Sequence, residues 1–200
     1  MKKIHLGCGS VYLKGYTNVD GKFDNHYLAS DRPDIVEKNI TTYEKYYKYP
    51  VTRLDIEQRN LIKQDVVVDM YAEDYDNLPF EENSLDEILL VQVFEHFSWE
   101  EGKTLLNYWY KLLKPGGKII IDVPDLDRTV DGYYHSRTQY DKDWYARLLF
   151  GSQKNKYAFH KGMYNKESLE RALKEAKFKH IQQARSLNHF YPAFGLEGIK

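Results

Sequence analysis

The sequence predicts one α/β domain with a mostly parallel central sheet, helices on both faces and an antiparallel hairpin near the C-terminus. Short apolar runs alternate with helical patterns along the 200 residues, an order typical of parallel βαβ units. Three of the expected strands end in or near an aspartate. No repeat of about 20–50 residues is visible, which argues against a solenoid.

Five strands are expected, at residues 3–6, 16–20, 65–69, 87–91 and 118–123. The second, third and fifth end in or near Asp20, Asp69 and Asp122. Because open α/β sheets bind ligands at the carboxyl ends of their strands, these acids mark the edge where a site is expected.

Two helices have clear start signals. Ser98 and Glu101 form a capping-box pattern before an apolar face, and Pro115 with two glycines ends that helix. Asn165 is expected to cap a second helix. Residues 180–187 and 196–200 are then expected to form the terminal hairpin.

The segment 21–64 interrupts the alternation, and we interpret it as a cap or lid inserted into a single domain spanning 1–200. Tyr43, Tyr46 and Tyr47 share one face of a short expected helix ending before Pro50. Long connections are often functional, and these tyrosines, together with Tyr49, are candidates to stack on a sugar ring. A packing face with no ligand role is the alternative.

Composition excludes several classes of protein. The formal net charge is −1, which argues against a nucleic-acid binder, since such proteins carry a basic excess. The longest aliphatic run, 88–91, is far shorter than a membrane span. Cys8 is the single cysteine, so no internal disulfide forms and a cysteine zinc site is not expected. No secretory signal is visible, and a cytoplasmic location is expected.

A glycine turn follows the first expected strand. Gly7 and Gly9 allow a sharp turn and the close approach of a ligand. Asp20, at the end of the second strand, can accept hydrogen bonds from both hydroxyls of a ribose. Each signal alone is weak, because tight turns often contain glycines and Asp20 precedes Gly21.

Several motifs in order strengthen this interpretation. LGCGS is followed by GYTNVD, LPFEENSLDEI, FEHF, LKPGG and VPDLD. Together they resemble the class I S-adenosylmethionine-dependent methyltransferases, in particular the type 11-like branch with an LGCGS turn. The resemblance implies a Rossmann-like fold and S-adenosylmethionine as the cofactor.

The resemblance also implies roles for single residues. Gly7 and Gly9 would pack against the methionyl and ribose parts of the cofactor, and Asp20 would hold the ribose hydroxyls. Asp69 and Met70 would flank the adenine, and Gln92 would face the sulfonium or the methionyl group. Two positions depart from the common pattern: His5 replaces an acid, and Val11 replaces the third glycine.

Methyl transfer requires alignment of a nucleophile with the sulfonium methyl group, and an alcohol also needs a base. Asp125 is a candidate base or substrate ligand, with helix capping as the alternative. His160 matches a histidine of the resembling branch and is the second catalytic candidate.

His96 follows Glu95 at the end of the fourth strand. In one subset of methyltransferases ExxEH binds a divalent metal at this point, but Gln92 occupies the first position here. We therefore assign no metal, and interpret His96 as a residue hydrogen-bonded to the backbone.

The sequence thus predicts a methyltransferase acting on a hydroxyl or amine of a small molecule, with a sugar, sugar nucleotide or glycan precursor preferred. A non-catalytic, cofactor-binding partner subunit is the alternative, because of His5 and Val11. A nicotinamide-dependent oxidoreductase would require a fuller GxGxxG than the GCGSVY present. The acceptor and the oligomeric state are not predicted.

Overall fold

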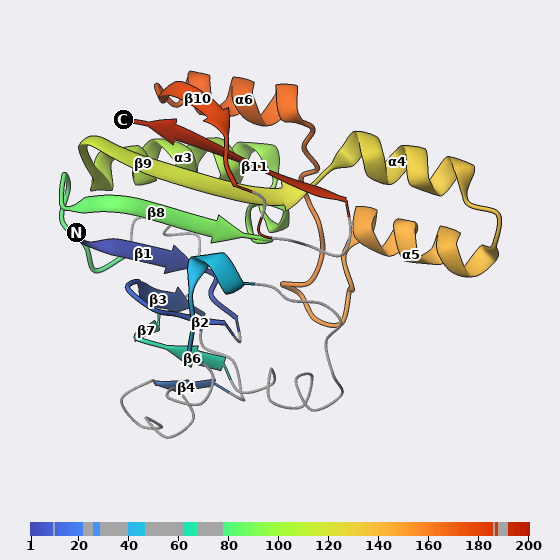
Figure 1. Ribbon diagram of the computed structural model, residues 1–200, viewed down its shortest axis with the longest axis horizontal. Helices are drawn as coiled ribbons and strands as arrows, with labels where there is room; N and C mark the ends of the chain where they lie inside the picture. The colour runs from blue at the N-terminus through green and yellow to red at the C-terminus, as the bar shows by residue number, and fades with distance from the viewer. Residues whose placement is uncertain are drawn as a thin grey trace.

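The computed structural model describes residues 1–9, 11–21, 26–28, 40–46, 62–67, 78–185, 187 and 192–200. A seven-stranded sheet with the order β10-β11-β9-β8-β1-β3-β7 forms its centre (Figure 1). The strands are β1 (Lys3–Leu6), β3 (Thr17–Asp20), β7 (Val66–Val67), β8 (Leu85–Val91), β9 (Leu113–Pro124), β10 (Lys179–Gln183) and β11 (Ala193–Ile199). Across the sheet, the neighbouring strands from β9 through β8, β1 and β3 to β7 are all parallel, whereas β11 is antiparallel to both β9 and β10. This topology confirms the predicted fold class.

The helices are α3 (Trp99–Leu112), α4 (Leu126–His135), α5 (Gln139–Phe150) and α6 (Lys166–Glu175), with short 3-10 helices η1 (Tyr43–Lys45) and η2 (Phe94–His96). Two small parallel pairs join β2 (Tyr12–Leu13) to β5 (Ile40–Thr41) and β4 (His26–Leu28) to β6 (Ile62–Gln64). None of the helices in the described part of the chain has the length and apolar composition that a membrane crossing requires.

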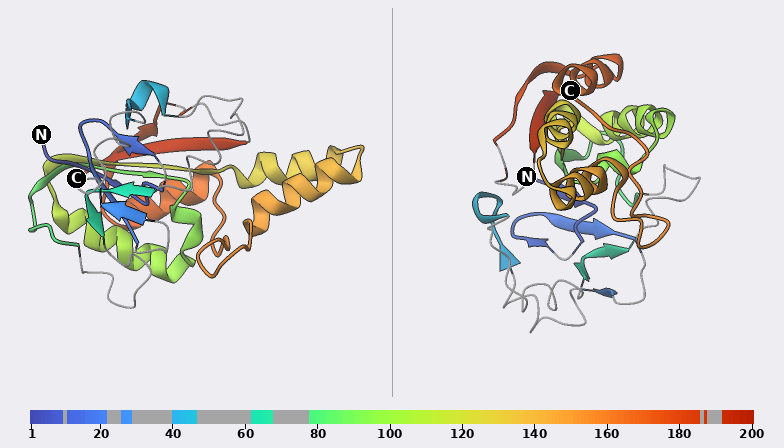
Figure 2. Two further views of the ribbon diagram at one scale, coloured as in Figure 1. Left: turned by 90° about the horizontal axis from the view of Figure 1, so that it is seen from below. Right: turned by 90° about the vertical axis from the view of Figure 1, so that its right-hand side faces the viewer.

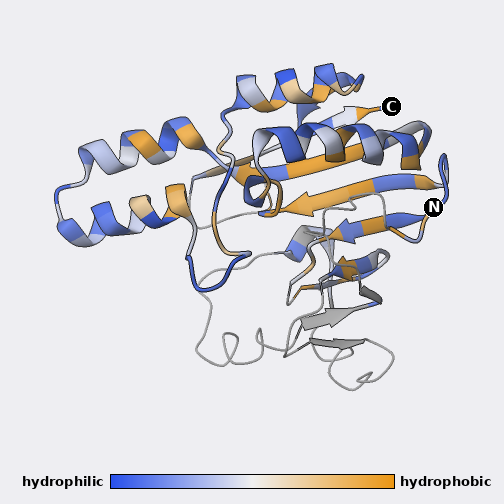
Figure 3. Cartoon of the chain, turned by 180° about the vertical axis from the view of Figure 1, so that it is seen from behind, coloured by the Kyte–Doolittle hydropathy of each residue, from blue (hydrophilic) through white to orange (hydrophobic). Residues whose placement is uncertain are grey.

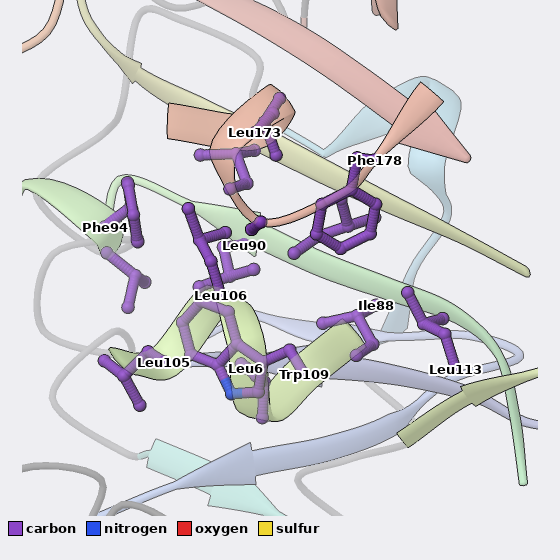
Figure 4. Close-up of a cluster of buried hydrophobic side chains, with 14 of the residues drawn as sticks. Leu6, Ile88, Leu90, Phe94, Leu105, Leu106, Trp109, Leu113, Leu173 and Phe178 are labelled. Atoms are coloured by element: carbon purple, nitrogen blue, oxygen red, sulfur yellow. The ribbon is translucent and has the colours of Figure 1, made fainter. Parts of the chain in front are cut away.

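Helix α3 begins where the sequence predicted. The Ser98 side chain accepts from the backbone N–H of Glu101, whose carboxylate in turn accepts from the N–H of Ser98. Leu105, Leu106 and Trp109 are buried against the sheet (Figure 4). Each such side chain contributes about 1.5–3 kcal/mol by leaving water, so burial of this face stabilises the helix more than its cap does.

Strand β8 is buried on both faces, as expected for the centre of a parallel sheet. Ile88 and Leu90 join the core under α3 and α6, whereas Leu89 and Val91 join a second cluster that includes Leu13 and Tyr46. Apolar residues run along β8 and β9, and α3 turns hydrophilic residues outward (Figure 3). The second cluster shows that residues of the predicted insert cover one face of the sheet.

Helices α4 and α5 form an antiparallel pair that extends beyond the end of the sheet (Figure 2). The sequence analysis did not predict this pair. Thr138 caps α5, and Gly132 in α4 lies so close to the ring of Tyr145 that a Cβ would overlap with it. The helices therefore pack mainly on each other, and they leave Tyr134 and Tyr140 exposed.

The remaining predicted elements can be compared with the structure. Helix α6 is capped by Asn165, and β10 and β11 form the predicted antiparallel hairpin. Within 21–64 the expected helix is a short 3-10 turn, η1, and residues 47–50 lie outside the described residues. The third strand is described only over Val66–Val67.

Candidate functional site

The glycine turn between β1 and β3 places two glycines in the left-handed region, with different surroundings. Gly7 has a φ of +66°, and a Cβ there would overlap with the side chain of Val93. Gly9 has a φ of +53°, and no described atom lies within 4 Å of the place where its Cβ would be. Gly7 is therefore required by packing, whereas the turn beside Gly9 leaves room for a ligand.

Asp20 ties this turn to the end of β3. Its carboxylate accepts from the backbone N–H of Gly9 at 2.6 Å and from that of Gly21 at 2.7 Å. Burial raises the pKa of Asp20, and the two N–H groups partly offset this effect. A carboxylate has about four acceptor positions, so these bonds leave capacity for a further donor such as a ribose hydroxyl.

Gln92 directly follows β8 and has a φ of 56°, which is uncommon for a residue with a side chain. Its backbone N–H donates to the carbonyl oxygen of Asp122, and its side-chain Nε2 donates to Asp122 Oδ1 at 2.8 Å. Gln92 is thus anchored to the end of β9. Asp69 and Met70, the other expected cofactor contacts, lie outside the described residues.

Asp125 is the N-cap of α4. Its Oδ1 accepts from the backbone N–H of Arg128 at 3.1 Å. The residue also forms a parallel bridge with Tyr164, and the N–H of Leu126 donates to the carbonyl oxygen of Tyr164. The capping role is therefore present, and it places Asp125 next to the chain segment that follows His160.

His160 lies against the short helix after β8. The backbone N–H groups of Lys161 and Gly162 both donate to the carbonyl oxygen of Glu95, at 2.9 and 3.0 Å. The rings of His96 and His160 meet edge to face with centroids 4.9 Å apart. Two histidines that are distant in the sequence thus form one cluster with Glu95.

Burial controls protonation in this cluster. It lowers the pKa of His96 to about 4, with a smaller contribution from His160, and it lowers that of His160 as well. Burial also raises the pKa of Glu95 to about 8. Both imidazoles are therefore neutral near pH 7. Sequence reasoning found the two histidines but not the burial of Glu95, which no local pattern reveals.

His5, which replaces an acid of the methyltransferases that the sequence resembles, is fully buried. Its Nδ1 lies 3.1 Å from Asn18 Oδ1, and its Nε2 lies 2.5 Å from the hydroxyl of Tyr46. Burial lowers the pKa of His5 to about 4. The departure from the common pattern is accommodated by a tyrosine of the insert.

A separate cleft is lined by charged residues of three strands of the sheet. Its lining includes Lys3 at the start of β1, Glu87 near the start of β8 and Lys118 in the middle of β9. Glu87 forms ion pairs with both lysines. Neither Asp20 nor Gln92 nor the His96–His160 cluster lines this cleft, so we do not assign the site to it.

The chain is similar in part of its sequence and in its fold to known methyltransferases. A family model described as a methyltransferase domain matches residues 37–121. No curated protein matches the sequence.

Three solved structures are similar to the chain. A candidate O-methyltransferase from Nostoc punctiforme is 13% identical with a TM-score of 0.53, and the match covers 100% of this chain and 51% of that one. A chain in the complex of the Haloferax volcanii Trm112 methyltransferase activator with a candidate methyltransferase is 15% identical with a TM-score of 0.52, covering 99% and 81%. PigF with SAH is 12% identical with a TM-score of 0.52, covering 100% and 50%. The chain spans about half the length of the first and third.

At these identities the solved structures show the fold alone, which is a Rossmann-like methyltransferase fold. The family model matches less than half of this chain, and it shows that residues 37–121 are similar to a methyltransferase domain.

Proposed function

We propose that the protein transfers the methyl group of S-adenosylmethionine to a hydroxyl or amine of a small molecule, with a sugar, sugar nucleotide or glycan precursor as the acceptor class. The observation that carries this proposal is that both candidate half-sites follow the carboxyl ends of neighbouring parallel strands. The glycine turn and Asp20 follow β1 and β3, and the His96–His160 cluster follows β8, which pairs with β1.

The cofactor half-site uses Gly7 and Gly9 for the turn and Asp20 for the ribose. Gln92, held by Asp122, would face the methionyl group, and Asp69 with Met70 would flank the adenine. The open space beside Gly9 and the remaining acceptor capacity of Asp20 support this assignment.

His160 is our candidate for activating the acceptor. Its Nδ1 lies 2.8 Å from the carbonyl oxygen of Leu148, and since a carbonyl only accepts, this nitrogen carries the hydrogen. The other nitrogen, Nε2, therefore has a lone pair. The lowered pKa keeps the ring neutral near pH 7, so Nε2 can act on a proton of the acceptor.

Transfer is an in-line displacement at the methyl carbon. A lone pair of the acceptor oxygen or nitrogen forms the new bond to carbon while the carbon–sulfur bond breaks, and its electron pair returns to sulfur. S-adenosylhomocysteine leaves as a neutral thioether. The acceptor loses one proton, which His160 Nε2 would receive, and Asp125 would orient the acceptor through the carboxylate oxygen that does not cap α4.

Support for a sugar acceptor comes from the resemblance to a branch often associated with surface glycans, and from the near-neutral charge of the chain, which suits a small acceptor better than a nucleic acid. The insert supports it less than expected. Tyr46 is buried on His5, and Tyr43 packs against the same cluster. We also propose a cytoplasmic location, where S-adenosylmethionine and nucleotide sugars are available together.

The first test is a titration with S-adenosylmethionine and S-adenosylhomocysteine by calorimetry and thermal shift, with NAD as the control. A ligand at 100 times its Kd raises the melting temperature of a domain this size by roughly 5–11 °C. Binding of both sulfur ligands but not of NAD is expected, followed by methylation of a sugar nucleotide in an acceptor screen. Failure to bind either sulfur ligand would overturn the proposal in favour of a non-catalytic partner subunit.

A further inference from the structure

Glu95, His96 and His160 bring three potential ligand atoms together, all within 4.8 Å of one another. Two of these residues are adjacent in η2, and the third comes from the loop after α5. We call these three residues the Glu95 cluster.

The two imidazoles are held in the same tautomer. Nδ1 of His96 lies 3.0 Å from the carbonyl oxygen of Phe159, and Nδ1 of His160 lies 2.8 Å from that of Leu148. Each Nδ1 therefore carries its hydrogen, and each Nε2 has a lone pair. Among the described residues neither Nε2 has a hydrogen-bond partner. Metal-binding histidines typically show this arrangement, in which a carbonyl fixes one nitrogen so that the other can bind.

Glu95 supplies the second, independent observation. It is 1% exposed, and its Oε2 has no hydrogen-bond partner among the described residues. A buried carboxyl oxygen without a partner is unfavourable, and most native structures avoid it. A cation beside the two Nε2 atoms would supply the missing partner of this oxygen.

The backbone holds the cluster together without help from an ion. The carbonyl oxygen of Glu95 accepts from Lys161 and Gly162, and the N–H of His160 donates to the carbonyl oxygen of Phe150. The ammonium group of Lys161 lies 3.3 Å from the carboxylate of Glu101. That pairing reduces the repulsion which this ammonium group would exert on a cation in the cluster.

We propose that the Glu95 cluster binds one divalent first-row transition metal ion, and that Zn²⁺ is the ion it binds. Two imidazole nitrogens and one carboxylate suit zinc and its neighbours in the series, whereas Mg²⁺ and Ca²⁺ prefer all-oxygen sites. Three protein ligands leave the fourth position of a tetrahedral ion open. The sequence analysis assigned no metal because Gln92 replaces one ligand of the local pattern. In the structure Gln92 binds Asp122, and His160 completes the set from a distant segment.

Ion binding is independent of the proposed function, but the role of the ion rests on it. An acceptor hydroxyl in the open position would bind the ion through its oxygen and lose its proton more readily, because a metal ion lowers the pKa of a bound hydroxyl. His160 would then act on the acceptor through the ion, and the proton would pass to solvent.

The experiment uses the full chain with any histidine tag removed, treated with a chelator and dialysed. Co²⁺ is titrated as a spectroscopic probe, and Zn²⁺ is then added as a competitor. We expect one equivalent of Co²⁺ with the visible absorption of a low-symmetry site, displaced by one equivalent of Zn²⁺. Mg²⁺ in large excess should displace neither ion.

Glu95→Gln and His160→Gln each remove one ligand while keeping similar side-chain volume. Each should weaken Co²⁺ binding by more than the roughly 10–100-fold that loss of an outer-shell partner costs. His135→Gln is the matched control, because His135 is an exposed histidine paired with Asp131. It should bind Co²⁺ like the parent protein, and circular dichroism should show all four proteins folded.

Two results would overturn the ion site: a folded parent protein that binds no Co²⁺ or Zn²⁺, or variants that bind as tightly as the parent. S-adenosylmethionine binding and turnover, measured on the same samples, separate this proposal from the previous one. Turnover without metal binding would show that no ion takes part in the mechanism, and His160 would remain the proposed base. Metal binding without methyl transfer to any acceptor would support the ion site and remove the proposed activity.

Discussion

The hydroxyl of Tyr46 lies 2.5 Å from Nε2 of His5, and both residues are buried in the interior of the protein. On the opposite side of the ring Nδ1 lies 3.1 Å from Asn18 Oδ1. Because the amide oxygen only accepts, Nδ1 carries the hydrogen and Nε2 accepts from the tyrosine. Both nitrogens are satisfied in the neutral ring, and burial disfavours the charged imidazolium, which lowers the pKa of His5.

His5 should therefore make folding sensitive to acid. The pKa of His5 is about 4 in the folded protein and 6.5 in the unfolded chain. Between pH 6.5 and 4 the imidazole is therefore protonated in the unfolded chain but neutral in the folded protein. The stabilising contribution is complete above pH 6.5 and is lost as the pH falls to about 4, at most about 3 kcal/mol. Urea unfolding at several pH values measures it.

The control for this effect is His5→Gln, which removes the titration while keeping a polar side chain. His96 and His160 also have lowered pKa values, so the informative quantity is the difference between the two proteins across the pH range. A parent protein whose loss of stability from pH 6.5 to 4 equals that of the variant would contradict the assignment.

Gly7 and Gly9 should respond differently to alanine. Both have positive φ, and a side chain there costs about 1–2 kcal/mol. At Gly7 the methyl group would also overlap with Val93, which adds about 1–3 kcal/mol of overpacking. Gly7→Ala should thus lower the free energy of unfolding more than Gly9→Ala, measured by urea titration.

For ligand binding we expect the opposite order, with Gly9→Ala losing more affinity for S-adenosylmethionine than Gly7→Ala. The space beside Gly9 is open, so its alanine variant should fold but bind S-adenosylmethionine more weakly, because the methyl group would occupy space intended for the cofactor. Calorimetry on the folded fraction compares the two. Unchanged affinity of Gly9→Ala would place the cofactor elsewhere.

Asp20 should recognise the ribose through a charged acceptor. Hydrogen bonds to charged groups contribute about 1.5–3 kcal/mol, so Asp20→Ala should weaken S-adenosylmethionine binding by about 10- to 150-fold. Loss of the bond to the N–H of Gly9 would contribute as well, which makes a second measurement necessary.

A 2′-deoxy analogue of S-adenosylmethionine separates the two contributions. The parent protein should bind this analogue more weakly than the cofactor, and Asp20→Ala should bind both alike, because the partner of the missing hydroxyl is gone. Asp131→Ala, at an exposed position in α4, is the control. A variant that still discriminates between the two ligands would show that another residue holds the ribose.

Local signals explain which parts of the fold the sequence predicted. The apolar runs of β1 and β8 and the capping box of Ser98 and Glu101 act over a few residues, and these elements were found. Helices α4 and α5 were missed because they pack on each other and keep aromatic residues such as Tyr134 and Tyr140 in solvent. No buried face of the usual width marks them in the sequence.

The contacts of the candidate site also divide into those that local sequence signals predict and those that only the folded chain shows. Gly9 and Asp20 are close in the sequence, and their hydrogen bond follows from two adjacent parallel strands. The contact of His96 with His160 instead depends on backbone hydrogen bonds from Lys161 and Gly162 to Glu95. Such contacts arise only in the folded chain, which is why His160 could be proposed from a resemblance but its partners could not.

Asp125 allows a cap to be distinguished from a substrate contact. Its Oδ1 accepts from the N–H of Arg128, and loss of an N-cap costs about 1 kcal/mol, or a fall of roughly 2–4 °C in melting temperature. Asp125→Ala should show this fall together with reduced turnover. Asp125→Ser keeps a good capping residue but removes the carboxylate, so its melting temperature should stay near that of the parent.

Turnover of Asp125→Ser with a productive acceptor decides between the two roles. If Asp125 orients the acceptor, kcat/KM should fall in both variants although only the alanine variant loses stability. If capping is its whole contribution, the serine variant should be as active as the parent. His160→Ala is the reference for the chemical step, since loss of general acid–base catalysis lowers kcat by about 10²–10⁴-fold. A His160 variant with unchanged kcat would remove that residue from the mechanism, whichever way Asp125 is resolved.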